Sequence, residues 1–414
     1  MQKRTITMGF FSNVFRTNDK ADKTTAEPRE VDFIAALSMH LRGEVSPALS
    51  NYLKIAEELP DDNLAPFFAA AIKAGEGNIA EAAESLRSLS QRISLKGETI
   101  SRAISLDLVA LLSNEPFLTV PAVAEIIISF GDILKKEGFV QESAVCFEIA
   151  TGLVPDNVHV LHRLGDTLHD LGIYDYAESV LLEALKHAPN HWGALYTYAV
   201  LLQDLKRYAE ATTYYEKAVR LDPNHVRCQN NYGAALMMTN RLDEALAHCT
   251  LAAELAPDFL PVKINLGNIH LLLQEYETAR TNYLEAISLD KNLAPAYFGL
   301  ASVEKLLGSD SGRVRELYLK AIELNPSIPD AHHALGNLLA HEGKPEALSH
   351  FSAAAQLNNN LKNLHKDFGN ACLQMGRREE AIEHLRIARQ QDPDDVVTQE
   401  TLSRLEEETR TKSS

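Results

Sequence analysis

Six histidines gather in two predicted helices, where a metal ion or a proton transfer could use them: His159, His162 and His169 in the first, and His332, His333 and His341 in the second. His162 and His169 share one helix face two turns apart, and Asp166 is the nearest carboxylate. A metal site needs three or four converging ligands. This spacing does not supply them, so we expect partly buried or exposed helix histidines and no metal.

The sequence contains no arrangement typical of an enzyme. A P-loop, a GxSxG elbow, a GxGxxG turn after a strand and an HExxH helix are all absent. The carboxylate pairs Glu57-Glu58, Asp61-Asp62 and Glu379-Glu380 fall at predicted turns or helix starts, where negative charge suits the helix dipole. We therefore expect no catalytic residues and no cofactor.

The predicted helices that position these side chains belong to a repeating pattern. Prolines at 155, 189, 223 and 257 stand 34 residues apart, and the same mark continues at Lys291, Pro326, Asn359 and Pro393 with intervals of 33 to 35. Proline suits a turn or a first helical position, and Asn or Asp beside it can cap the next helix. A period of this length predicts stacked helical hairpins.

Small residues recur at fixed offsets inside each period. In 158–191 the first predicted helix face comprises Leu161, Leu164, Gly165 and Leu168, and after a turn at Gly172 the second comprises Ala177, Leu181 and Ala184. Two antiparallel helices pack closely only where small residues occupy the crossing. The unit 192–225 carries Leu195, Tyr198, Ala199, Leu202, Ala211, Tyr215, Ala218 and Pro223 at the matching offsets.

These units resemble the tetratricopeptide repeat, and the pattern covers eight units over 124–395. The unit 294–328 has one extra residue and the unit 329–361 lacks one, both at the turn between the helices. The resemblance implies an all-α fold, a right-handed superhelical solenoid of antiparallel helical hairpins. It also implies a concave groove, lined by first helices, that binds protein or peptide.

The rest of the chain matches the tetratricopeptide pattern less well. Residues 29–123 read as a degenerate block of the same kind, with an irregular hairpin at 96–123 that could bend the array. Residues 396–410 read as a C-terminal capping helix, and 1–28 and 411–414 are expected to be disordered. The apolar face of the capping helix comprises Val397, Leu402 and Leu405.

Asparagines recur on the predicted first helices: Asn230, Asn231, Asn265, Asn268, Asn337 and Asn370. An amide donates and accepts at once, so it can pair with a peptide backbone of any sequence. This ladder resembles the asparagine-lined groove of the repeats in O-linked N-acetylglucosamine transferases, here without a catalytic domain. The other interpretation, solvated polar residues on an exposed helix face, stays open.

Tyr196, His333 and Lys366 share another groove position with His162. Tyr196 could anchor an apolar side chain of a partner. Lys366 and Asn370 match the first part of the carboxylate clamp in the chaperone-tail-binding branch of the family. Because no full repeat follows them, the rest of that clamp is missing and we do not expect it.

Composition narrows the function further. The formal net charge of -17 disfavours a nucleic-acid partner, which needs a basic surface. The four cysteines, Cys146, Cys228, Cys249 and Cys372, form no CxxC pair and are expected as buried thiols of a reduced, cytoplasmic protein. The sequence has no run of 18 apolar residues, so it predicts no membrane span. Residues 8–15 are apolar enough to touch a membrane or a partner. The other interpretation is a disordered start of the chain with Met8 as the initiator.

The sequence thus favours an interaction scaffold or adaptor that binds peptide segments and could self-associate end to end. A substrate-recognition or assembly subunit of a separate, glycosyltransferase-like enzyme is the first alternative. Only residues 396–414 follow the last predicted repeat, so any catalysis is expected from another subunit. A membrane-associated assembly factor anchored through residues 8–15 is the second alternative.

Overall fold

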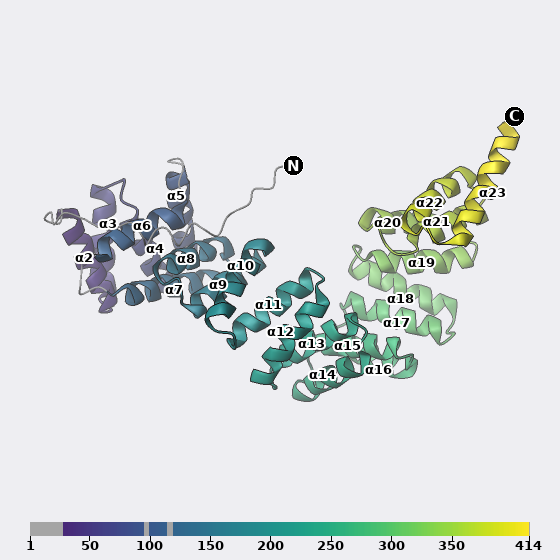
Figure 1. Ribbon diagram of the computed structural model, residues 1–414, viewed down its shortest axis with the longest axis horizontal. Helices are drawn as coiled ribbons and strands as arrows, with labels where there is room; N and C mark the ends of the chain where they lie inside the picture. The colour runs from purple at the N-terminus through teal and green to yellow at the C-terminus, as the bar shows by residue number, and fades with distance from the viewer. Residues whose placement is uncertain (1–27, 95–98, 114–118, 414) are drawn as a thin grey trace. The chain divides into compact units, whose positions relative to one another are not determined.

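The computed structural model describes residues 28–94, 99–113 and 119–413, and every regular element in these ranges is an α-helix (Figure 1). The predicted all-α solenoid of helical hairpins is therefore confirmed, and its right-handed superhelical sense stays a prediction. Residues 1–27, with the apolar segment 8–15, lie outside the described residues.

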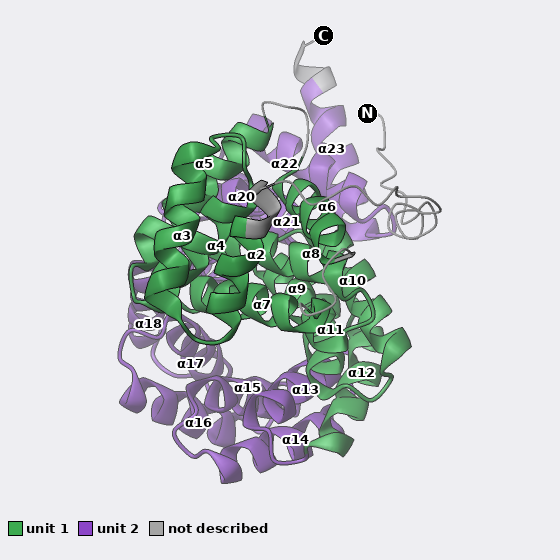
Figure 2. Ribbon diagram, turned by 90° about the vertical axis from the view of Figure 1, so that its left-hand side faces the viewer, with its two compact units in different colours: residues 1–222 green, residues 223–414 purple. Residues whose placement is uncertain are grey.

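The chain divides into two units, Met1–Asp222 and Pro223–Ser414, coloured green and purple in Figure 2. The helices of unit 1 are α2 (Pro28–Leu41), α3 (Val45–Glu58), α4 (Leu64–Gly75), α5 (Ile79–Ser94), α6 (Ile100–Ser113), α7 (Val120–Lys136), α8 (Val140–Leu153), α9 (Val158–Asp170), α10 (Tyr174–His187), α11 (Trp192–Asp204) and α12 (Tyr208–Leu221). Those of unit 2 are α13 (Val226–Met238), α14 (Leu242–Leu255), α15 (Leu260–Leu272), α16 (Tyr276–Leu289), α17 (Ala294–Leu306), α18 (Ser311–Leu324), α19 (Pro329–His341), α20 (Ala347–Leu357), α21 (Leu364–Gln374), α22 (Arg378–Gln391) and α23 (Val396–Ser413).

The turn inside each hairpin needs a residue with left-handed backbone. Gly172, the predicted turn residue, has φ 72°, whereas Lys206, Asn240 and Gln274 take the same place in the next three hairpins with φ 61–62°. A left-handed residue other than glycine costs about 1–2 kcal/mol. The backbone hydrogen bonds that end α11 nevertheless match those that end α9. The turns at Lys206 and Gln274 therefore hold strain that glycine would relieve, whereas asparagine at 240 tolerates this conformation.

The helix starts use two kinds of cap. Asn157 accepts hydrogen bonds from the backbone N–H groups of His159 and Val160, as the sequence predicts for a residue beside the turn proline. At α11 and α13 the cap is instead a histidine, since His191 Nδ1 and His225 Nδ1 each accept a backbone N–H at 3.1 Å. These rings can cap only while Nδ1 is unprotonated.

Close helix crossings depend on glycine, as predicted. A Cβ atom on Gly165 would lie 2.5 Å from Leu181 Cγ, far inside van der Waals contact. Leu164 and Leu168 of the same helix are buried. The α9–α10 pair therefore approaches closely through a small residue and fills the space beside it with leucine.

The segment 96–123 differs from the predicted irregular hairpin. Its described residues form one helix, α6, and the first turn of α7. Helix α6 packs against α8, where a Cβ on Gly152 would lie 2.8 Å from Ser105 Oγ. Ile104 and Leu108 of α6 are fully buried. Helix α6 therefore covers apolar surface of α8 as a single helix and does not form a hairpin with a second helix of its own.

Helix α23 packs against the end of unit 2 and buries part of the apolar face that the sequence predicted for it. Leu402 and Leu405 are buried against Ile382 and Leu385 of α22. Val397 is 64% exposed, so its predicted packing role is wrong, because it lies on the side of the helix that α22 does not reach. The helix also continues to Ser413, and residues 411–413 are helical because no Gly or Pro interrupts them.

Candidate functional site

In each unit the first helices of neighbouring hairpins contact one another, α9 with α11 in unit 1 and α13 with α15 and α15 with α17 in unit 2. Within the described residues no second helices approach each other to the same extent. The first helices therefore lie on the inner side of the local curve, as predicted. We call the inner face of α13 the residues Arg227, Asn230, Asn231, Ala234, Met237 and Met238, and use the term for the matching residues of the other first helices.

Three of the predicted asparagines meet on this face. Asn230 is 4% exposed, and its Nδ2 donates to Asn231 Oδ1 at 3.1 Å. From the next first helix, Asn265 Nδ2 donates to Asn230 Oδ1 at 2.9 Å. The amides thus form a chain of hydrogen bonds from α13 to α15. Asn230 sits inside this chain, so Asn231 and Asn265 are the half-buried amides that a partner can reach.

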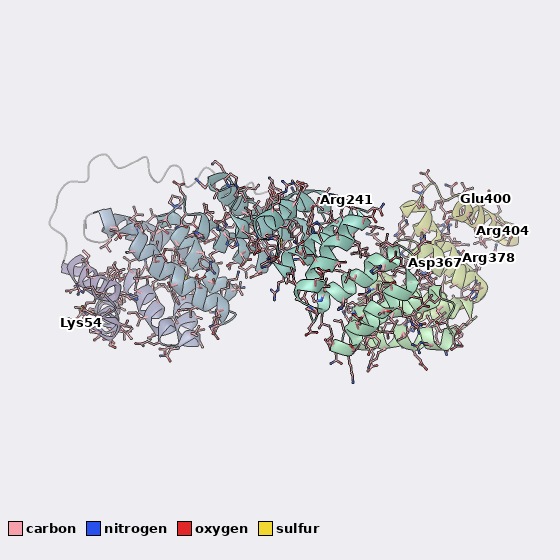
Figure 3. The ribbon with its side chains drawn as sticks, turned by 90° about the horizontal axis from the view of Figure 1, so that it is seen from below. Lys54, Arg241, Asp367, Arg378, Glu400 and Arg404 are labelled. Carbon is pink, nitrogen blue, oxygen red and sulfur yellow. The ribbon has the colours of Figure 1, made fainter. Side chains whose placement is uncertain are left out.

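A second polar group lies on α19 and α21. His333 Nε2 and Asn337 Nδ2 both lie within hydrogen-bond distance of Asp367 Oδ2, at 2.8 and 3.0 Å (Asp367 is labelled in Figure 3). Asn337 Nδ2 also lies 3.1 Å from His333 Nε2. The predicted residues His333 and Asn337 are therefore brought together by a carboxylate that the sequence analysis did not single out.

These contacts follow one rule across the array. His162 bonds to Thr197 at 3.1 Å, Asn230 to Asn265, and His333 to Asp367, and each pair is 34 or 35 residues apart. One repeat position thus bonds to the following position of the next hairpin. Burial lowers the pKa of His162 to about 4, so its ring is neutral at pH 7. We call this set of three contacts the inner ladder.

The comparison with known proteins identifies the repeat. Residues 192–225 match a family model described as "Tetratricopeptide repeat", and so do 214–247 and 317–347 in a second model of that description; 267–308 match one described as "TPR repeat". The chain contains tetratricopeptide repeats. A tetratricopeptide repeat protein from Parabacteroides merdae is 15% identical, with 60% of this chain and 98% of that chain aligned at a TM-score of 0.51.

Two further solved structures align with this chain at lower TM-scores. YrrB, described as a TPR protein with an unusual peptide-binding site, is 24% identical over 45% of this chain and 96% of its own, with a TM-score of 0.35. The hetero-tetramer Cut9–Hcn1 of the APC/C aligns over 92% of this chain and 96% of that chain, with 14% identity and a TM-score of 0.49. No curated protein sequence matches the chain.

The remaining predicted site residues of the tetratricopeptide hairpins have separate surroundings. Asn268 Oδ1 accepts a hydrogen bond from Tyr283 at 2.7 Å, and Asn370 is exposed. Tyr196 stacks on Trp192, with ring centroids 5.3 Å apart and planes 10° apart. Lys366 pairs with Asp395 at 2.7 Å, and this hydrogen bond, with those from Thr398, lowers the pKa of Asp395 to about 2.

Two histidine pairs inside tetratricopeptide hairpins of unit 2 escaped the sequence analysis. His332 Nδ1 lies 3.2 Å from His350 Nδ1, and His365 Nδ1 lies 3.0 Å from His384 Nδ1. His332 and His365 each place Nε2 3.1 Å from the backbone oxygen six residues earlier. Their Nε2 atoms carry the hydrogen, so the partner rings donate from Nδ1. Burial lowers the pKa of His350, His365 and His384, which keeps these rings neutral.

Other chemistry on the described residues is limited. No group of three or more His, Cys, Asp or Glu side chains there could hold a metal ion. In the same ranges no helix has the length and apolar character that a membrane crossing requires. All four cysteines are free and buried in helices, as predicted. Burial raises the pKa of Cys249 to about 12 and that of Cys372 to about 11, so both thiols stay protonated.

Proposed function

We propose that the chain is an interaction scaffold, or adaptor, whose inner face binds peptide segments of partner proteins. The supporting observation is a set of amides held in fixed orientation. Tyr283 occupies only the oxygen of Asn268, and within the described residues the Nδ2 of Asn268 makes no hydrogen bond. Asn265 is held through its Nδ2, and its Oδ1 accepts none there. One donor and one acceptor can pair with the backbone of a peptide of any sequence.

The other predicted groove residues contribute to the proposed binding face within their own units. Asn231 and Asn230 continue the amide chain on α13, and Tyr196 offers an aromatic surface in unit 1. The remaining residues of the proposed site on unit 2 are Asn337, Asn370, His333 and Lys366. His333 and Asn337 already bond to Asp367, so we propose that they recognise a partner through that carboxylate group as a unit.

The test is affinity capture with the intact protein, beside two variants. In the first, Asn268 and Asn370 are changed to Ala, which removes two inner-face amides, of which Asn268 also accepts a hydrogen bond from the buried Tyr283. In the matched control, Asn282 of α16 and Asn360 of a turn are changed to Ala, which removes the same number of amides elsewhere. A partner retained by the wild type and the control, and lost by the first variant at unchanged helicity, supports the inner face. Equal capture by all three proteins excludes it.

The alternatives drawn from the sequence stay predictions. The likeness to O-linked N-acetylglucosamine transferase repeats would make the chain a recognition subunit of a separate enzyme. Membrane association would depend on residues 8–15, so deletion of residues 1–20 should then shift the protein between cell fractions. We also propose a cytoplasmic, reducing location, supported by four free cysteines.

A further inference from the structure

Three large apolar side chains stand exposed in a row on the inner face of unit 2. Met238, Leu272 and Leu306 end α13, α15 and α17, at the same repeat position, and are 55%, 55% and 56% exposed. Among the large apolar residues that the structure describes, only Val396 and Val397 of α23 are more exposed. Because the first helices contact one another in this order, the three side chains belong to neighbouring hairpins and form one strip.

The electrostatic character of this strip differs from that of the rest of the protein. The chain has 57 Asp and Glu residues against 40 Lys and Arg, yet the inner faces of α13, α15 and α17 carry no carboxylate. They carry two cations, Arg227 and Lys305. Both are exposed, and neither forms an ion pair with any residue that the structure describes. On α21, by contrast, Lys366 is neutralised by Asp395.

We propose that the inner faces of α13, α15 and α17 bind an acidic peptide segment with large apolar side chains. The apolar side chains rest on Met238, Leu272 and Leu306, and the carboxylates meet Arg227 and Lys305. This inference rests on the proposed function and names the class of partner. Charge complementarity supports it, since a net charge of -17 repels an acidic segment elsewhere and these two free cations attract it here.

The geometry sets the length and spacing of the segment. Arg227 lies near the start of α13 and Lys305 near the end of α17. Met238 lies eleven residues after Arg227, about 16 Å along α13, and the strip from Met238 to Leu306 runs about 20 Å across two helix spacings. A segment that follows α13 and then the strip therefore covers about 36 Å, or ten or eleven extended residues. A polyproline-type segment advances about 9 Å every three residues, so an apolar residue at each third position would meet each helix in turn.

The experiment is a selection of displayed random peptides of about twelve residues on the intact protein, followed by affinity measurement. The charge variant carries Arg227→Glu and Lys305→Glu. Its matched control carries Lys291→Glu and Arg389→Glu, two exposed cations outside the inner face that form no ion pair with described residues. A third variant, Leu272→Ser, removes the central apolar contact at a position that is already 55% exposed.

We expect selected peptides to combine Asp or Glu at the flanks with at least two large apolar residues between. The charge variant should bind them at least about tenfold more weakly at low salt, the Leu272→Ser variant should also bind weakly, and the control should bind normally. Peptides overturn this inference and leave the proposed function standing if they lose binding to the variant with Asn268→Ala and Asn370→Ala but show no acidic preference, or if they bind the charge variant normally. No selected peptide, or binding insensitive to every inner-face change, refutes both.

Discussion

Tyr283 occupies a slot between two glycines, and filling that slot should destabilise unit 2. A Cβ atom on Gly299 of α17 would lie 2.4 Å from Cε1 and Cζ of the Tyr283 ring. On α15, a Cβ on Gly267 would lie 2.7 Å from Cε1 of the same ring. Tyr283 is fully buried, so the ring has no free space to enter. Two successive hairpins are therefore held together through one aromatic side chain.

The Gly299→Ala substitution tests this contact. Carbon atoms pack at about 3.5–4.0 Å, so the ring must move by more than about 1 Å. Overpacking of this kind costs about 1–3 kcal/mol, and the upper end applies because the movement also breaks the hydrogen bond from Tyr283 to Asn268. Alanine regains about 1 kcal/mol of helix propensity. We expect a net loss of about 2 kcal/mol, measured as a lower midpoint of urea unfolding by circular dichroism.

A double-mutant cycle separates the contact from other effects. In a Tyr283→Leu background the ring is gone, and Gly299→Ala should be neutral or slightly stabilising, which gives a coupling of at least about 1 kcal/mol. Gly75→Ala is the control, since no atom lies within 4 Å of its Cβ position. A Gly299→Ala protein as stable as the wild type, or an equal loss in both backgrounds, would refute the reasoning.

Three further outcomes are expected. Gln274→Gly should raise the free energy of unfolding in urea by about 1 kcal/mol because it relieves a left-handed turn. Gly172→Ala should lower this free energy by a similar amount, and opposite signs would contradict the turn assignment. The free energy of unfolding should fall as pH drops below the ordinary histidine pKa of 6.5. Burial lowers the pKa of His365 and His384, so the unfolded chain binds more protons than the folded one in that range. The double change His365→Gln and His384→Gln should flatten the dependence of stability on pH. Glu304→Gln should lower the free energy of unfolding by about 1–2 kcal/mol, because this buried carboxylate pairs with two partly exposed arginines that would lose their partner. An unchanged urea midpoint would show that these ion pairs are dispensable.

The sequence predicted the hairpin array because its signals are local. Proline spacing marks the turns between hairpins, and a glycine such as Gly165 opposite a leucine marks each close crossing. The turns at Lys206 and Gln274 carried no such signal, since their left-handed backbone is imposed by the helices on both sides. Sequence also could not reveal that α6 packs on α8 rather than on an arm of its own.

The site was predicted only in outline. Repeat position correctly brought Asn230, Asn231 and Asn265 to one face, but only the contacts between helices show that Asn230 is buried as the link. Asp367 was missed because carboxylates are common in this chain and its partners lie one hairpin earlier. The pair His332–His350 depends on side-chain orientation across a hairpin, which spacing alone does not give.

The inner ladder also has a mechanical consequence within unit 2. A polar bond joins α13 to α15, and another joins α19 to α21, whereas Gly299 and Ala334 occupy the receiving positions on α17 and α19 and can accept no side-chain bond. The α15–α17 step is held instead by the Tyr283 ring between Gly267 and Gly299. Among the described residues, the step from α17 to α19 has neither a polar bond of this ladder nor that ring, so we expect bending of unit 2 to concentrate there.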